Sequence, residues 1–131
     1  MAEYSYVVGI DPSVTSTGVA WQNIETGALE HYLIRLGKLR DPERVSLIAQ
    51  LCGHAVFGTV DALVVIEGHG PQKGNGLVNI ALHWMIRAEV RKHAFHCDVM
   101  VVPPMTLKKF VADSGRAEKS EVGAHIMRRW G

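Results

Sequence analysis

Two short apolar runs, each ending on a carboxylate, constrain the fold of this chain more than any other feature of its sequence. Residues 7–10 are followed by Asp11, and residues 62–66 are followed by Glu67. The second run comes after a predicted helix and is typical of a parallel strand in the centre of a sheet. If the two strands are neighbours, their carboxylates emerge side by side, and such a pair favours a bound cation because like charges repel. The plainer alternatives are an Asx turn at Asp11 and two unrelated structural carboxylates.

Hydrophobic periodicity and turn residues predict the element order β-β-β-α-β-α-β-α-α. Glu25-Thr26-Gly27 is a tight-turn signal, which indicates that the first three strands form an antiparallel meander. The expected strands cover residues 4–11, 17–24, 28–36, 62–67 and 97–102. The expected helices cover 42–57, the stretch from Asn75 or Gly76 to His93, a short segment after Thr106, and 117–129.

The first two predicted helices are amphipathic. In the first, Asp41 is the expected N-cap acceptor and Pro42 takes the first helical position. The side of this helix that is expected to pack on the sheet comprises Val45, Ile48, Cys52 and Ala55. The apolar side of the second helix is expected to be buried or to form an interface, and it comprises Leu77, Ala81, Trp84 and Ala88, widened by Ile80 and Met85.

Composition excludes a membrane-spanning chain and favours one globular domain. The 131 residues are 47% hydrophobic and 21% charged, and no apolar run approaches the roughly 20 residues that a span needs. Cys52 and Cys97 match no metal-binding spacing and are expected to be buried thiols of a reducing cytoplasm. Residues 1–70 carry 4 Lys/Arg and 8 Asp/Glu, whereas residues 71–131 carry 10 and 5. An acidic half beside a basic half suits a site that holds metal ions and binds a polyanion.

Three stretches of the sequence carry a resemblance to a known family. They are Gly9-Ile10-Asp11-Pro12, Val65-Ile66-Glu67, and the segment from Leu107-Lys108-Lys109-Phe110-Val111 to Gly115-Arg116-Ala117-Glu118-Lys119-Ser120-Glu121-Val122. Together they resemble the RuvC-like Holliday-junction resolvases. The residue that follows Asp11-Pro12 is Ser13, which is more like the phage members of the family, because the bacterial enzymes often have glycine at this position. The resemblance implies an α/β, ribonuclease-H-like fold. Such a fold has a mixed five-stranded sheet, with the first three strands antiparallel and the others parallel, and helices on both faces.

The resemblance also implies roles for individual residues. In the family, acidic residues at the positions of Asp11 and Glu67 bind a divalent metal, which is Mg²⁺ or Mn²⁺ here. Lys108 and Lys119 match lysines that act on the DNA backbone near the cut. The remaining residues expected to bind DNA are Lys109, Arg116 and, in the glycine-rich loop after Glu67, Lys73. A solvated helix face is the plainer alternative for the basic residues of the 107–122 segment.

The family places further acidic ligands on a final helix, and this sequence ends at Trp130-Gly131 before any such segment. We therefore expect one nuclease domain over residues 1–131 that lacks its final helix. Two carboxylates suffice to hold one metal ion, but a second metal site is expected to be poor.

The resemblance implies a metal-dependent endonuclease that hydrolyses phosphodiester bonds in branched DNA and resolves Holliday junctions, with forks and flaps as further candidate substrates. A four-way junction is cut at two related strands, so a homodimer is expected. The expected location is the cytoplasm, which is that of the bacterial host if the protein is phage-encoded. One alternative is a junction-binding protein that does not cut. Another is an actin-like ATPase fragment, because the phosphate loop of that group also has Gly-Ile-Asp before a Thr-rich turn.

Overall fold

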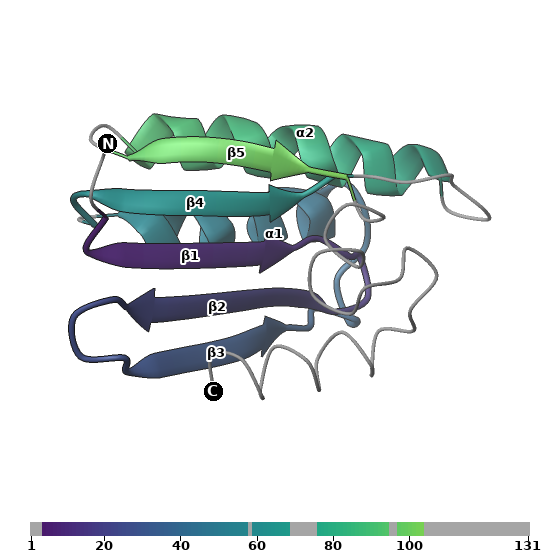
Figure 1. Cartoon of the computed structure of the whole chain (residues 1–131). Coiled ribbons are helices and arrows are strands. Elements are labelled where there is room, and N and C mark those ends of the chain that lie inside the picture. The colour runs from purple at the N-terminus through teal and green to yellow at the C-terminus, as the bar shows by residue number, and fades with distance from the viewer. Residues whose placement is uncertain (1–3, 58, 69–75, 95–96, 104–131) are drawn as a thin grey trace.

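The computed structural model describes residues 4–57, 59–68, 76–94 and 97–103. They form, in chain order, β1 (Tyr6–Asp11), β2 (Thr17–Asn23), β3 (Leu29–Ile34), α1 (Glu43–Val56), β4 (Ala62–Glu67), α2 (Gly76–His93) and β5 (Asp98–Val102) (Figure 1). Strand β4 and helix α2 begin and end where the sequence predicts, and the other bounds differ by one or two residues. The helices predicted beyond residue 103 lie outside the described residues.

The five strands form one mixed sheet in the order β3-β2-β1-β4-β5. The pairs β1–β2 and β2–β3 are antiparallel, whereas β1–β4 and β4–β5 are parallel, as predicted. Strands β1, β3, β4 and β5 therefore end at one edge of the sheet, where β2 begins (Figure 1). We call this the carboxyl edge, and the opposite one the amino edge.

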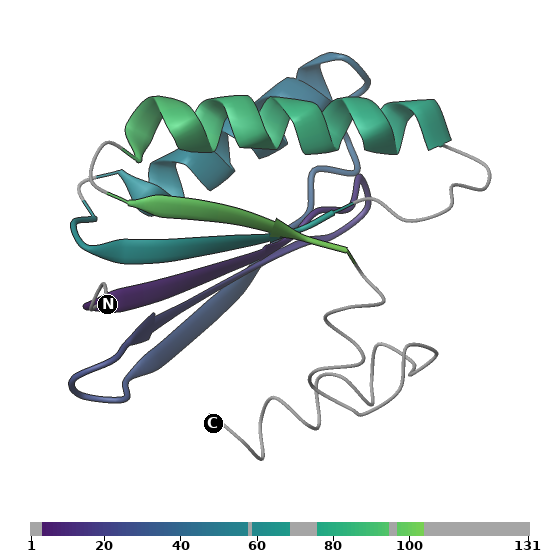
Figure 2. The ribbon, with the colours of Figure 1, turned by 45° about the horizontal axis from the view of Figure 1, so that its top comes forward.

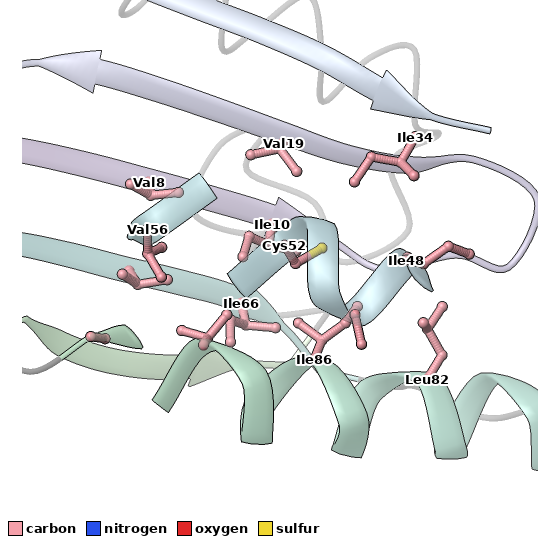
Figure 3. Close-up of a cluster of buried hydrophobic side chains, with 14 of the residues drawn as sticks. Val8, Ile10, Val19, Ile34, Ile48, Cys52, Val56, Ile66, Leu82 and Ile86 are labelled. Atoms are coloured by element: carbon pink, nitrogen blue, oxygen red, sulfur yellow. The ribbon is translucent and has the colours of Figure 1, made fainter. Parts of the chain in front are cut away.

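The core lies between the sheet and the two described helices, which cover the same face (Figure 2). Alternate residues of the central strands point toward the helices and are buried, namely Val8 and Ile10 on β1 and Val64 and Ile66 on β4. Helices α1 and α2 supply the other half of this core, with Ile48, Cys52, Val56, Leu82, Ile86 and Val90 (Figure 3). Strand periodicity then directs Gly9, Asp11, Val65 and Glu67 to the other face of the sheet, which we call the second face.

Helix α1 packs on the sheet with the predicted side, whereas the side of α2 that was expected to be buried or to form an interface is not buried against the sheet. Val45, Ile48 and Cys52 of α1 are buried, whereas Leu77 and Trp84 of α2 are 85% and 59% exposed. The buried side of α2 comprises Leu82, His83, Ile86 and Val90. Helix α2 has apolar residues on both sides, so periodicity alone does not select which side packs on the sheet.

The start of α1 also differs from the prediction. Pro42 is the N-cap residue, and no side chain caps the first turn. Asp41 instead accepts two hydrogen bonds from Arg44, both 2.9 Å long, one from Nε and one from Nη2. A bidentate ion pair with a guanidinium outcompetes a single backbone N–H for this carboxylate.

The two cysteines are free thiols. Cys52 is fully buried, and burial raises its pKa to about 12, so the thiol stays protonated and uncharged. Cys97 is half-buried, and its Sγ donates a hydrogen bond of 3.3 Å to the Thr59 carbonyl oxygen. Among the described helices, none is both long and apolar enough to cross a membrane.

Candidate functional site

Asp11 and Glu67 occupy adjacent positions on neighbouring strands. Strands β1 and β4 pair in parallel, up to Ile10 opposite Ile66, and the two acids are the next residues along each strand. Ile10 and Ile66 point into the core, so both acids emerge on the second face of the sheet, where both are partly buried. Neighbouring strands lie about 4.8 Å apart, so the two acidic side chains start from adjacent backbone positions on the same face.

These acids belong to a row of residues that crosses the sheet at its carboxyl edge. The strand registers pair Val102 with Glu67 on one side, and Asp11 with Gly18 and then Leu33 on the other. A Cβ at Gly18 would lie 3.8 Å from both the Asp11 Cβ and a Leu33 methyl, so Gly18 forms a low floor between two side chains on the same face. A Cβ at Gly9, two residues before Asp11, would have no atom of the described residues within 4 Å. Beside Asp11 the sheet therefore admits close approach of a ligand.

The turn after Asp11 is fixed by hydrogen bonds. The buried Thr17 hydroxyl donates to the Ser13 carbonyl oxygen at 2.7 Å and accepts from the Ser13 N–H at 3.0 Å. Val14, between them, is buried in the core. The Ser13 and Thr15 hydroxyls lie 3.0 Å apart. Because these hydrogen bonds link both ends of the turn, they restrict the direction in which the backbone continues after Asp11.

The backbone after Glu67 is equally constrained. The N–H of Gly68 donates a hydrogen bond of 2.6 Å to the carbonyl oxygen of Val102, which extends the β4–β5 pairing. A Cβ at Gly68 would lie 3.3 Å from a Val101 methyl and 3.4 Å from the Val102 oxygen. A side chain at position 68 would therefore be tightly packed against β5, and the neighbouring atoms would have to shift by a few tenths of an ångström to accept it.

The donor atoms of Asp11 and Glu67 fit a hard divalent cation. Mg²⁺ and Mn²⁺ prefer carboxylate oxygens, and Mg²⁺ commonly takes one or two protein carboxylates while keeping several waters. Gly18, beside Asp11, adds no side chain to this part of the sheet. Among the described residues, no group of three or more His, Cys, Asp or Glu side chains is placed to hold a metal, so these residues offer a two-carboxylate site.

The basic residues expected to bind DNA, Lys73, Lys108, Lys109, Arg116 and Lys119, all lie outside the described residues. Within the described part, other basic side chains stand at the carboxyl edge, and sequence reasoning did not single them out. They are Arg35, Lys38 and Arg40, in the loop between β3 and α1. The signal that marks them is their clustering, since every Lys and Arg of residues 1–70 falls between 35 and 44.

Comparison with known proteins shows the fold. The sequence matches no protein-family model and no curated protein sequence. The structure is similar to that of Thermus thermophilus RuvC, with a TM-score of 0.69 and 21% identity over 94% of this chain and 78% of that chain. It is also similar to T. thermophilus RuvC in complex with a Holliday junction substrate, with a TM-score of 0.65 and 18% identity over 95% of this chain and 79% of the other. The chain therefore has the RuvC-like, ribonuclease-H-like α/β fold that its sequence predicts.

Proposed function

We propose that this chain is a metal-dependent endonuclease, of the phage type, that hydrolyses phosphodiester bonds in branched DNA and resolves Holliday junctions. The observation that carries the proposal is the adjacency of Asp11 and Glu67 on the second face of the sheet, beside a glycine floor. The similarity to a RuvC structure that holds a Holliday junction substrate supports four-way DNA as the substrate class.

In this proposal each residue has a separate task. Asp11 and Glu67 hold Mg²⁺ or Mn²⁺, which when bound supplies a Lewis acid for the phosphate and lowers the pKa of water. The braced turn at Ser13 and the β5 contact of Gly68 keep the two carboxylates oriented. Lys108 and Lys119 steady the scissile phosphate with their ammonium charges.

The outward side of α2 supports a homodimer. Four residues that the sequence predicts to be buried or in an interface are exposed, and they form an apolar stripe of Leu77, Ala81, Trp84 and Ala88. The guanidinium of Arg87 lies 4.6 Å above the Trp84 ring and covers part of it. A two-fold axis through this stripe gives a dimer with two equivalent sites, as symmetric cutting of a four-way junction requires.

The test is nicking of an end-labelled synthetic four-way junction in Mg²⁺ or Mn²⁺. We expect the wild type to nick two related strands, and Asp11→Asn or Glu67→Gln to lose cutting on the order of a hundredfold or more. Both variants should still bind the junction, and removing negative charge near phosphates should tighten that binding. Glu30→Gln is the matched control, because Glu30 is exposed at the far end of β3.

Two results would replace the proposal with another function. Wild-type binding without nicks would assign the chain as a junction-binding protein that does not cut. A rise in unfolding temperature with ATP but not with DNA would revive the actin-like ATPase reading, since a ligand stabilises the native state that binds it. Full nicking by Asp11→Asn would contradict the assignment of the acids themselves.

A further inference from the structure

The loop between β3 and α1 concentrates positive charge in the acidic half of the chain. Residues 1–70 contain 8 acidic residues and 4 basic ones, and all 4 basic residues fall within 35–44. Arg44 is held by Asp41 through a bidentate pair. The other three, Arg35, Lys38 and Arg40, are exposed, and we call them the basic loop.

The basic loop keeps its charge available. The ion pairs among the described residues are Arg44–Asp41, Lys92–Glu89 and His93–Glu89, and none of them uses a basic-loop residue. Arg35 donates one hydrogen bond from Nε to the Ser16 hydroxyl, at 3.3 Å. That bond consumes one of five N–H donors and no charge. Three cations without acidic partners, in a half of the chain that is otherwise acidic, are positioned to meet an anion.

The loop stands at the same edge of the sheet as the acidic pair. Strand β3 ends at Ile34 at the same edge of the sheet as β1 and β4, with the start of β2 between β3 and β1 (Figure 1). Leu33 lies in the same cross-sheet row as Asp11, with Gly18 between them, and Arg35 follows two residues later. Because the strand spacing is about 4.8 Å, β3 lies about 10 Å from β1. The Arg35 bond to Ser16 further ties the loop to the turn that follows Asp11.

We propose that the basic loop binds phosphates of the DNA strand that runs across the carboxyl edge, about three nucleotides from the phosphate at the acidic pair. The spacing refers to Arg35, which directly follows β3, and comes from about 10 Å between β3 and β1 and about 3.4 Å of DNA axis per nucleotide. Lys38 and Arg40 lie further along the loop toward α1. This inference rests on the proposed function, and it adds a contact region that the resemblance does not supply. Phosphate contacts of this kind fix the register of the DNA on the protein without reading its sequence.

The experiment compares two double variants of the whole chain. Lys38→Gln/Arg40→Gln removes two basic-loop charges but leaves Arg35 and its Ser16 bond intact. Arg91→Gln/Lys92→Gln makes the same charge change at the end of α2, over the amino edge of the sheet. The Kd for a labelled four-way junction is measured over a range of salt concentrations without divalent metal.

We expect the plot of log binding constant against log salt for Lys38→Gln/Arg40→Gln to flatten by about 1.8, since each lost phosphate contact removes about 0.9. Each single variant should give about half of this change. The Arg91→Gln/Lys92→Gln control should keep the wild-type slope. An unchanged slope in the basic-loop variant, or the same flattening in the control, would overturn the inference while leaving the nuclease proposal in place.

A second measurement locates the contact. Neutral methylphosphonate linkages about three nucleotides from the cut should weaken wild-type binding but should have little further effect on Lys38→Gln/Arg40→Gln. Additive losses would show that the loop and these phosphates do not meet, and would contradict the inference. If the wild type neither binds nor nicks junctions, the proposed function fails first, and the inference fails with it.

Discussion

The two edges of the sheet differ in what their charged side chains contact. At the amino edge, two acidic side chains have close partners: the Tyr4 hydroxyl donates to Asp98 at 2.6 Å, and Lys92 binds Glu89 at 3.2 Å. At the carboxyl edge, two acids stand on adjacent strands, and three cations near them have no acidic partner among the described residues. Under the proposed function, the carboxyl edge is the one that meets a ligand with both metal and phosphate character.

The largest difference between the two edges should appear in the Mn²⁺ affinity of variants that remove one acid from each edge. Asp11→Asn should weaken Mn²⁺ binding on the order of a hundredfold, because losing a ligand costs at least as much as losing a residue that orients one. Asp98→Asn, at the amino edge, should leave Mn²⁺ affinity unchanged. Titration calorimetry or Mn²⁺ electron paramagnetic resonance measures both. Equal Mn²⁺ affinity in the two variants would remove the distinction between the edges.

The apolar stripe of α2 should be the site of dimer formation. Trp84→Asp should raise the dimer dissociation constant about thirtyfold or more, since truncating a central interface tryptophan costs about 2 kcal/mol. Analytical ultracentrifugation measures the constant. Phe57→Asp is the control, because Phe57 is an exposed aromatic residue at the end of α1. A Trp84→Asp protein that dimerises like the wild type would place the interface elsewhere.

The glycine floor should matter for chemistry more than for stability. Gly18→Val places methyl groups beside the Asp11 Cβ, and we expect cutting to fall about tenfold as the ligand is displaced. The unfolding temperature should change little, because valine suits a strand and Gly18 sits in one. Ala20→Val, two residues along the same face, is the control. Equal cutting by the two variants would mean that Gly18 lines no ligand site.

The smallest effect concerns the Tyr4–Asp98 contact. The hydrogen bond to Asp98, helped by desolvation and the negative charge, raises the pKa of Tyr4 above 10.0. Folding thus favours protonated Tyr4, so its stabilising contribution is present below pH 10.0 and is lost as pH rises through the folded pKa. Tyr4→Phe should lower the unfolding temperature slightly at neutral pH and not at all well above pH 10.0. A gap that persists at high pH would contradict this origin.

The strands and their order could be predicted because local pattern decides them. Residues 62–66 are apolar throughout, which is typical of a central strand, and this strand follows a helix and pairs in parallel with β1. The adjacency of Asp11 and Glu67 then follows from where the two apolar runs end. Their roles as metal ligands stay a prediction.

The sequence does not decide features for which two groups of residues compete, such as the side of α2 that packs on the sheet and the partner of Asp41. Helix α2 is apolar on two sides, and only the packing of α1 and the sheet selects Leu82 and Ile86 over Leu77 and Trp84. Asp41 has the right position to cap α1, but its carboxylate instead accepts a hydrogen bond from Arg44, one turn later. The basic loop escaped notice because charged loop residues resemble ordinary solvated surface until the topology places the end of β3 at the same edge of the sheet as the two acids.

The most direct test of the account is a double-mutant cycle on cutting. If Asp11 and Glu67 hold one cation together, Asp11→Asn and Glu67→Gln should each abolish the same step, and the double variant should cut no more slowly than either single variant. Nicking rates of the four proteins on one labelled junction, at one Mn²⁺ concentration, give the answer. Losses that multiply in the double variant, or full cutting by Glu67→Gln, would contradict a shared metal site at the ends of β1 and β4.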